Sequence, residues 1–120
     1  MDKLQEMFKI QFKSQETLGT WEKVNESKQN KQEFINQMIL ACYEEVNEIM
    51  RETPYKNPDF VKFGWKKTQL GNNDLMKEEI IDLFHFVMNL FIVSGGNAEE
   101  FYEIYKKKNQ KNLERWKGDY

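Results

Sequence analysis

The chain has 120 residues, a formal net charge of −2 and a single cysteine, Cys42. This length suits one domain with a modest core, the charge gives no overall attraction to nucleic acid, and one cysteine with one histidine excludes both an intrachain disulfide and a zinc site. Since no apolar run approaches the roughly 18 residues of a membrane span, and the N-terminal MDKLQEMFKIQ lacks the pattern of a signal peptide, we expect a single cytoplasmic domain over residues 1–120 that does not act at a membrane.

The first half of the chain predicts two amphipathic helices. Residues 3–18 carry apolar side chains at helical spacing and end before Gly19. Residues 53–73 contain both prolines of the protein and two of its glycines, so we expect a long connection there. Between these segments, residues 31–52 place apolar side chains four and three residues apart, at Ile35, Ile39, Cys42, Val46 and Ile49.

The second half predicts two further helices, and no segment predicts a strand. The third helix runs from about residue 74 to residue 93 and stops at the sequence SGG. The fourth begins at NAEE, where Asn97 can cap the helix and Glu100 can complete a capping box. We therefore expect an all-α fold made of four helices.

The third helix is apolar around most of its circumference and has one polar strip. At about 100° per residue, the strip occupies a sector roughly 120° wide. Taken alone, such a strip is typical of the solvated face of a mostly buried helix. Its members are Glu78, Glu79, Asp82, His85 and Asn89.

The second helix carries a matching acidic pair. Glu45 and Glu48 are three residues apart and so share a face, with Glu45 at the border of the apolar stripe and Glu44 pointing away. Two acidic pairs that face one another repel, a cost that folds accept where a positive group lies between them. The two pairs therefore predict a positive group between the second and third helices.

The fourth helix adds basic residues on its apolar side. The stripe begins with Phe101 and Tyr105 and continues with Lys108, Asn112 and Arg115, so we expect the two cations to point inward. A basic C-terminus that complements the helix dipole accounts for the other lysines but not for these two positions. Carboxylates for a divalent cation, together with inward cations for phosphate oxygens, indicate a site for a metal-bound polyphosphate, with Mg²⁺ as the favoured ion.

Four segments carry a resemblance to a known family. They are EVNE at 45–48, FGWKK at 63–67, EIIDLFHFVMNLF at 79–91 and KKNQKNLERWKGDY at 107–120. Together they resemble the all-α nucleotide pyrophosphatases, in particular the dimeric dUTPases and the phage dCTP/dUTP pyrophosphatases, with the MazG-like enzymes as more distant relatives. The resemblance implies a compact four-helix bundle of this all-α NTP pyrophosphatase type, assembled as a homodimer.

The resemblance also implies a metal-dependent hydrolase. Its catalytic residues would hold magnesium ions, or manganese as a substitute, while a metal-activated water attacks the phosphoanhydride chain. The products would be a nucleoside monophosphate and pyrophosphate, with dUTP as the favoured substrate and dCTP or another dNTP as the alternative. The catalytic and metal-binding residues would be Glu45, Glu48, Glu79 and Asp82. Phosphate-binding side chains would be Lys66 or Lys67, Lys108, Asn112, Arg115 and Tyr120.

Base recognition would use the first and third helices. The family places a Gln in its first helix with an amide side chain four residues on, which corresponds here to Gln11 and Gln15. An amide can present both a donor and an acceptor to a pyrimidine edge. Beyond the carboxylates on the third helix, His85, Phe86 and Asn89 could stack on or pair with the base, and a structural role for His85 stays open.

Two other classes of protein fit parts of the pattern. A non-catalytic helical module could use its acidic strip to bind a basic partner. A small nucleic-acid-binding protein could use residues 106–117, which carry six basic side chains against Glu114. The acidic remainder of the chain disfavours the second class, and a test for magnesium-dependent pyrophosphate release separates an enzyme from the first.

Overall fold

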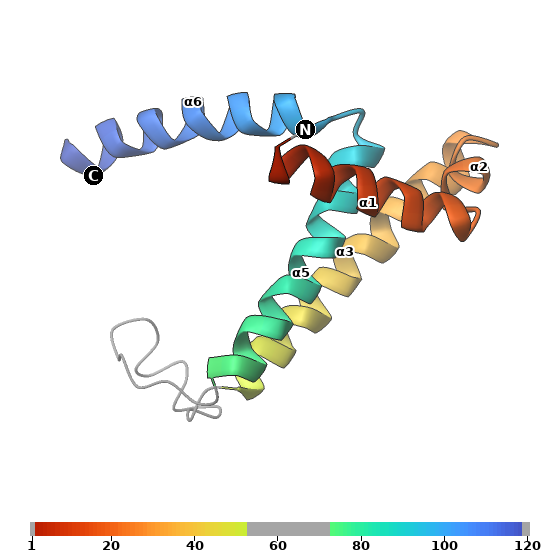
Figure 1. Cartoon of the computed structure of the whole chain (residues 1–120), viewed down its shortest axis with the longest axis horizontal. Coiled ribbons are helices and arrows are strands. Elements are labelled where there is room, and N and C mark those ends of the chain that lie inside the picture. The colour runs from red at the N-terminus through yellow and green to blue at the C-terminus, as the bar shows by residue number, and fades with distance from the viewer. Residues whose placement is uncertain (1, 53–72, 119–120) are drawn as a thin grey trace.

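The computed structural model describes residues 2–52 and 73–118, and these residues form five helices and no strand (Figure 1). The helices are α1 (Lys3–Thr17), α2 (Thr20–Val24), α3 (Lys28–Arg51), α5 (Asn73–Val93) and α6 (Ala98–Lys117). The expected all-α fold is confirmed. Apart from its last residue, which begins α5, the expected connection at 53–73 lies outside the described residues.

The sequence does not predict α2 or the first turn of α3. Gly19 adopts a left-handed conformation with φ of 76°, which lets the chain turn after α1. The indole N–H of Trp21 then donates to the carbonyl oxygen of Phe12 at 2.9 Å, which ties α2 to α1. The Ser27 hydroxyl accepts the backbone N–H of Asn30 at 3.0 Å, so this N-cap starts α3 at Lys28 instead of the expected residue 31.

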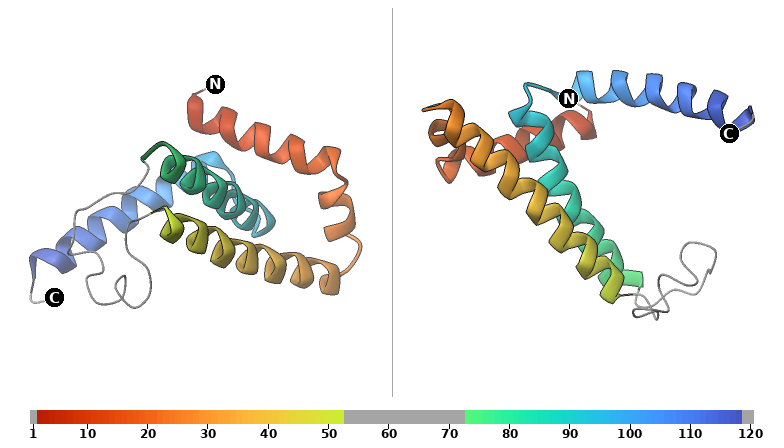
Figure 2. Two further views of the ribbon diagram at one scale, coloured as in Figure 1. Left: turned by 90° about the horizontal axis from the view of Figure 1, so that it is seen from below. Right: turned by 180° about the vertical axis from the view of Figure 1, so that it is seen from behind.

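The helices α3 and α5 lie side by side and antiparallel (Figure 1, Figure 2). The α1 and α2 helices cover the pair at the end where α3 begins and α5 finishes. The buried apolar side chains form two clusters at this end: Trp21, Val24, Phe34 and Val93 in one, and Phe8, Met88 and Ala98 in the other. The core therefore holds one end of the pair, and the acidic residues lie toward the other.

The helix α6 leaves α5 at a sharp angle. Gly95 has a φ of 90°, and α5 and α6 are bent by 104° relative to each other. The N–H groups of Gly95 and Gly96 donate to the carbonyl oxygens of Ile92 and Phe91, each at 2.9 Å. As the sequence predicts, Asn97 caps α6, because its side-chain oxygen accepts a backbone N–H of the first turn at 2.9 Å.

The direction of α6 differs from the expected compact bundle. The helix packs against α1 and, through Phe101, against α5, where the rings of Phe101 and Phe91 have centroids 5.1 Å apart. It then extends away from the α3–α5 pair (Figure 1). The radius of gyration is 17.3 Å, against about 13.6 Å for a compact chain of this length. The glycine turn is the physical reason, because it fixes a bend that keeps α6 from lying along its neighbours.

The length and apolar content of the described helices bear on whether one of them could span a membrane. No single helix among them is long and apolar enough to cross a membrane. Only α5 and α6 taken together, across their 104° bend, meet that criterion.

Candidate active site

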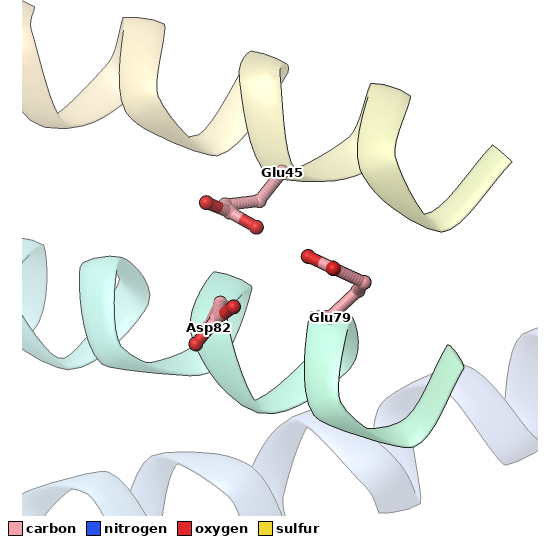
Figure 3. A group of neighbouring side chains, drawn as sticks. All are labelled: Glu45, Glu79 and Asp82. Carbon is pink, nitrogen blue, oxygen red and sulfur yellow. The ribbon is translucent and has the colours of Figure 1, made fainter. Parts of the chain in front are cut away.

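Three carboxylates from α3 and α5 meet in the space between these helices (Figure 3). Glu79 and Asp82 are three residues apart on α5 and so share a face, and Glu45 faces them from α3. One carboxylate oxygen from each residue lies within 4.8 Å of the other two. Glu45 and Glu79 are half-buried, and Asp82 is exposed. The acidic face predicted from the sequence therefore converges on one point, and we call these residues the carboxylate cluster.

Glu45 has the most perturbed environment in the cluster. Burial raises the pKa of its carboxyl group, and the negative charges of Asp82 and Glu79, together with a hydrogen bond to Glu79, raise it further. Its Oε2 atom is buried and has no hydrogen-bond partner among the described residues. A buried oxygen without a partner is costly, and a cation in the cluster would satisfy it while removing the repulsion between the three groups.

The chemistry of the donors fits a hard divalent cation. Carboxylate oxygens suit Mg²⁺, Mn²⁺ and Ca²⁺, whereas a zinc or copper site would call for imidazole or thiolate ligands. Mg²⁺ needs only one or two carboxylates when waters and substrate phosphates complete its coordination. The carboxylate cluster supplies three carboxylates, Glu45, Glu79 and Asp82, and so meets this requirement.

Glu48, the fourth carboxylate expected at the metal, does not join the group of three. Its side chain forms an ion pair with Arg51, one turn further along α3. The guanidinium offers a nearby positive partner, whereas the cluster offers only like charge. Arg51 is not among the residues expected at the site, although an acid followed three residues later by Arg on a helix is a recognisable ion-pair signal. The role of Glu48 as a metal ligand stays a prediction.

Two of the residues expected at the base form a buried amide pair. The Gln11 Nε2 atom of α1 donates to the Asn89 Oδ1 atom of α5 at 2.7 Å. The Asn89 Nδ2 atom lies 3.6 Å from the Met38 sulfur of α3, so the pair links three helices. Gln11 is 7% exposed and Asn89 is 2% exposed. Asn89 follows Asp82 by two turns of α5, or roughly 10 Å. The pair is thus within one nucleotide's length of the carboxylates.

The remaining base candidates are more scattered. The Gln15 Oε1 atom accepts a hydrogen bond from the Thr20 hydroxyl at 2.6 Å, where α1 meets α2. His85 is exposed and Phe86 is half-buried on α5. Their roles in binding a base stay predictions, and the structure directly joins only Gln11 and Asn89 among the five expected residues in the described part of the chain.

The phosphate-binding residues expected on α6 do not lie at the carboxylate cluster of the same chain. With 1.5 Å of rise per residue and the 104° bend, Lys108 and Asp82 are separated by roughly 20 Å along their helix axes, which exceeds the reach of a lysine side chain. Lys108 and Arg115 are exposed and Asn112 is half-buried, so the expectation that both cations point inward is wrong. The first turn of α6, with Ala98 and Phe101, contacts the core. The residues of the same stripe beyond Phe101 do not belong to either core cluster. The other expected phosphate ligands, Lys66, Lys67 and Tyr120, lie outside the described residues.

Comparisons with known proteins find relatives in bacteriophages. A dCTP pyrophosphatase of Enterobacteria phage T4 is 47% identical over 45 residues, which are 38% of this chain and 26% of that protein. A dCTP pyrophosphatase of Enterobacteria phage LZ5 is 50% identical over 40 residues, which are 33% of this chain and 23% of that protein. The matched segments thus span about a quarter of those proteins' own lengths.

A DNA replication protein of phage T4 is 49% identical over 35 residues, which are 29% of this chain and 9% of that protein. No solved structure matches the chain.

A family model described as dUTPase matches residues 3–99, a range that includes α1, α3, α5 and the whole carboxylate cluster. Because this match covers most of the chain, and because the fold is all-α as the resemblance implies, the protein belongs to the all-α dUTPase family.

Proposed function

We propose that this protein is a magnesium-dependent deoxynucleoside triphosphate pyrophosphatase that converts dUTP and water to dUMP and pyrophosphate. The carboxylate cluster carries this proposal: three carboxylates from two helices converge within 4.8 Å, and one of their oxygens is buried without a partner among the described residues. Membership of the dUTPase family supports the class of substrate. The reaction would take place in the cytoplasm, with residues 1–120 acting as one domain.

Each carboxylate has a defined part in this reaction. Glu45, Glu79 and Asp82 would hold the magnesium and, through it, place the phosphate chain between α3 and α5. When bound there, magnesium would neutralise charge on the phosphates and lower the pKa of the attacking water. Glu45 or Glu79 would orient that water by accepting its hydrogen bond.

The base is the second element of specificity. The Gln11–Asn89 pair lies roughly two helical turns from Asp82, and each amide carries both a donor and an acceptor. Uracil and cytosine present opposite donor and acceptor patterns at N3 and at the 4-position, and a rotated amide can match either one. We therefore keep dCTP as a second candidate, which the names of the two phage pyrophosphatases favour.

Pyrophosphate release from a panel of dNTPs tests the proposal. The purified protein should release pyrophosphate from dUTP or dCTP in the presence of Mg²⁺, should accept Mn²⁺ as a substitute, and should lose turnover in EDTA. The ratio of kcat/KM for dUTP and dCTP then identifies the base. A protein that released no pyrophosphate from any dNTP, with either metal, would fit a non-catalytic helical module and contradict the proposal.

A further inference from the structure

The hydrogen bonds of Gln11 and Asn89 run in one direction, which Met38 sets. The Gln11 Nε2 atom donates to the Asn89 Oδ1 atom at 2.7 Å, and the Asn89 Nδ2 atom faces the Met38 sulfur at 3.6 Å. A thioether sulfur can accept a hydrogen bond weakly but has no proton to donate. Met38 therefore favours the NH2 group of Asn89 on its own side, and the Asn89 carbonyl oxygen then faces Gln11.

The opposite arrangement of the two amides is unfavourable. If the Asn89 amide were rotated, its carbonyl oxygen would lie against the Met38 sulfur, which cannot donate to it. Because Asn89 is only 2% exposed, little water could replace the missing donor, and a buried acceptor without a partner is costly. The weak contact with the sulfur and the cost of the unpaired oxygen both favour the observed direction.

This direction determines what Gln11 offers to a ligand. Its Nε2 atom is engaged by Asn89, and within the described part of the chain its Oε1 atom makes no hydrogen bond. The Oε1 atom is accessible, because among the described residues only the Glu45 Oε2 atom is a buried side-chain atom without a partner. Asn89 is fully buried, so Gln11 is the member of the pair that can reach a base, and it offers a free acceptor.

From this geometry we infer that Met38 is a positioning residue that determines base specificity. Its sulfur orients the Asn89 amide, Asn89 orients the Gln11 amide, and Gln11 then matches one pyrimidine only. Uracil and cytosine exchange donor and acceptor at N3 and at the 4-position, so an amide held in one direction pairs with one base and opposes the other. The identity of the ligand rests on the proposed function, whereas the direction of the pair rests on the hydrogen bonds of the described residues.

Substrate selectivity tests the role of Met38. Met38→Leu conserves the side-chain volume but removes the sulfur, so neither direction of the Asn89 amide keeps an advantage. The ratio of kcat/KM for dUTP and dCTP should differ from 1 by at least about tenfold in the wild type, and Met38→Leu should move it toward 1 by about tenfold.

A second buried methionine provides the matched control. Met88 is 3% exposed and packs in the apolar cluster with Phe8 and Ala98. Met88→Leu makes the same chemical change there and should leave the selectivity ratio within about twofold of the wild type. A wild type that used both nucleotides equally, or equal ratios in Met38→Leu and the wild type, would overturn the inference.

Nuclear magnetic resonance tests the direction of the pair without any activity. In the metal-free and nucleotide-free protein, the side-chain NH2 protons of Asn89, assigned by their loss in Asn89→Leu, should show nuclear Overhauser contacts to the Met38 methyl group. Contacts to the Gln11 side-chain methylenes in their place would overturn the inference. A protein that kept the Met38 contacts but hydrolysed no dNTP would contradict the proposed function, while the direction set by Met38 would stand.

Discussion

The buried amide pair between α1 and α5 allows a stability prediction that follows directly from the structure. Replacing Gln11 with Leu leaves the Asn89 carbonyl oxygen, in a residue that is only 2% exposed, without its donor at 2.7 Å. A buried polar group that loses its partner costs about 1–3 kcal/mol of unfolding free energy. For a chain of this size, that range corresponds to a fall in Tm of about 4–12 °C.

The double variant separates the hydrogen bond from the change in packing. When Gln11→Leu and Asn89→Leu are combined, apolar groups of similar size replace both partners and no orphaned amide remains, so the stability should return toward that of the wild type. The double-mutant cycle should give a coupling free energy of about 1–3 kcal/mol. The assay is urea unfolding followed by circular dichroism, with EDTA present and the protein concentration held constant.

An exposed amide pair on α3 provides the matched control. The Gln32 Nε2 atom donates to the Asn36 Oδ1 atom at 2.9 Å, and both side chains are exposed. Gln32→Leu should change the unfolding free energy by less than about 0.5 kcal/mol, because water replaces the lost partner. If Gln11→Leu and Gln32→Leu lost equal unfolding free energy, or if the effects of Gln11→Leu and Asn89→Leu were simply additive, a stabilising hydrogen bond between Gln11 and Asn89 would be refuted.

Two further predictions concern the carboxylate cluster and the turn into α6. In the folded protein the pKa of Glu45 is raised above its ordinary value of 4.5. The metal-free protein therefore loses stability as the pH rises from the unfolded-state pKa through the folded-state pKa. In EDTA, Glu45→Gln should have a higher Tm than the wild type at pH 7 but not at pH 4. Equal Tm differences at both values would contradict this sign. Gly96→Ala should destabilise the protein by about 1–3 kcal/mol in thermal unfolding, since its Cβ would meet the Phe91 ring, whereas Gly118→Ala, whose Cβ would have no neighbour closer than 3.6 Å, should be nearly neutral.

The sequence predicts the parts of the fold that depend on long regular patterns. The apolar repeats of α3 and α5 extend over several turns, so both helices and their acidic faces can be located without a structure. The α2 helix has only five residues, too few for a repeat, and it depends on the left-handed Gly19 and the Trp21 hydrogen bond instead. Short elements of this kind are set by tertiary contacts.

The sequence predicts less about the site, because a helical wheel places residues on faces but does not orient whole helices. Glu45, Glu79 and Asp82 meet because α3 and α5 are adjacent and antiparallel. Lys108 shares the stripe of Phe101 on the wheel, yet the bend after α5 directs it away from the cluster of its own chain. The wheel also does not show with which group a charged side chain pairs, as the ion pair of Glu48 with Arg51 illustrates.

We propose that the carboxylate cluster binds the metal that turnover requires. Binding of Mn²⁺, measured by electron paramagnetic resonance, and pyrophosphate release should be compared in Glu79→Gln, Asp82→Asn and the neighbouring exposed control Glu78→Gln. We predict that the two cluster variants fold normally, bind Mn²⁺ at least about tenfold more weakly and lose turnover, while Glu78→Gln behaves as the wild type. Cluster variants that kept wild-type metal affinity and most of their magnesium-dependent activity would contradict the account.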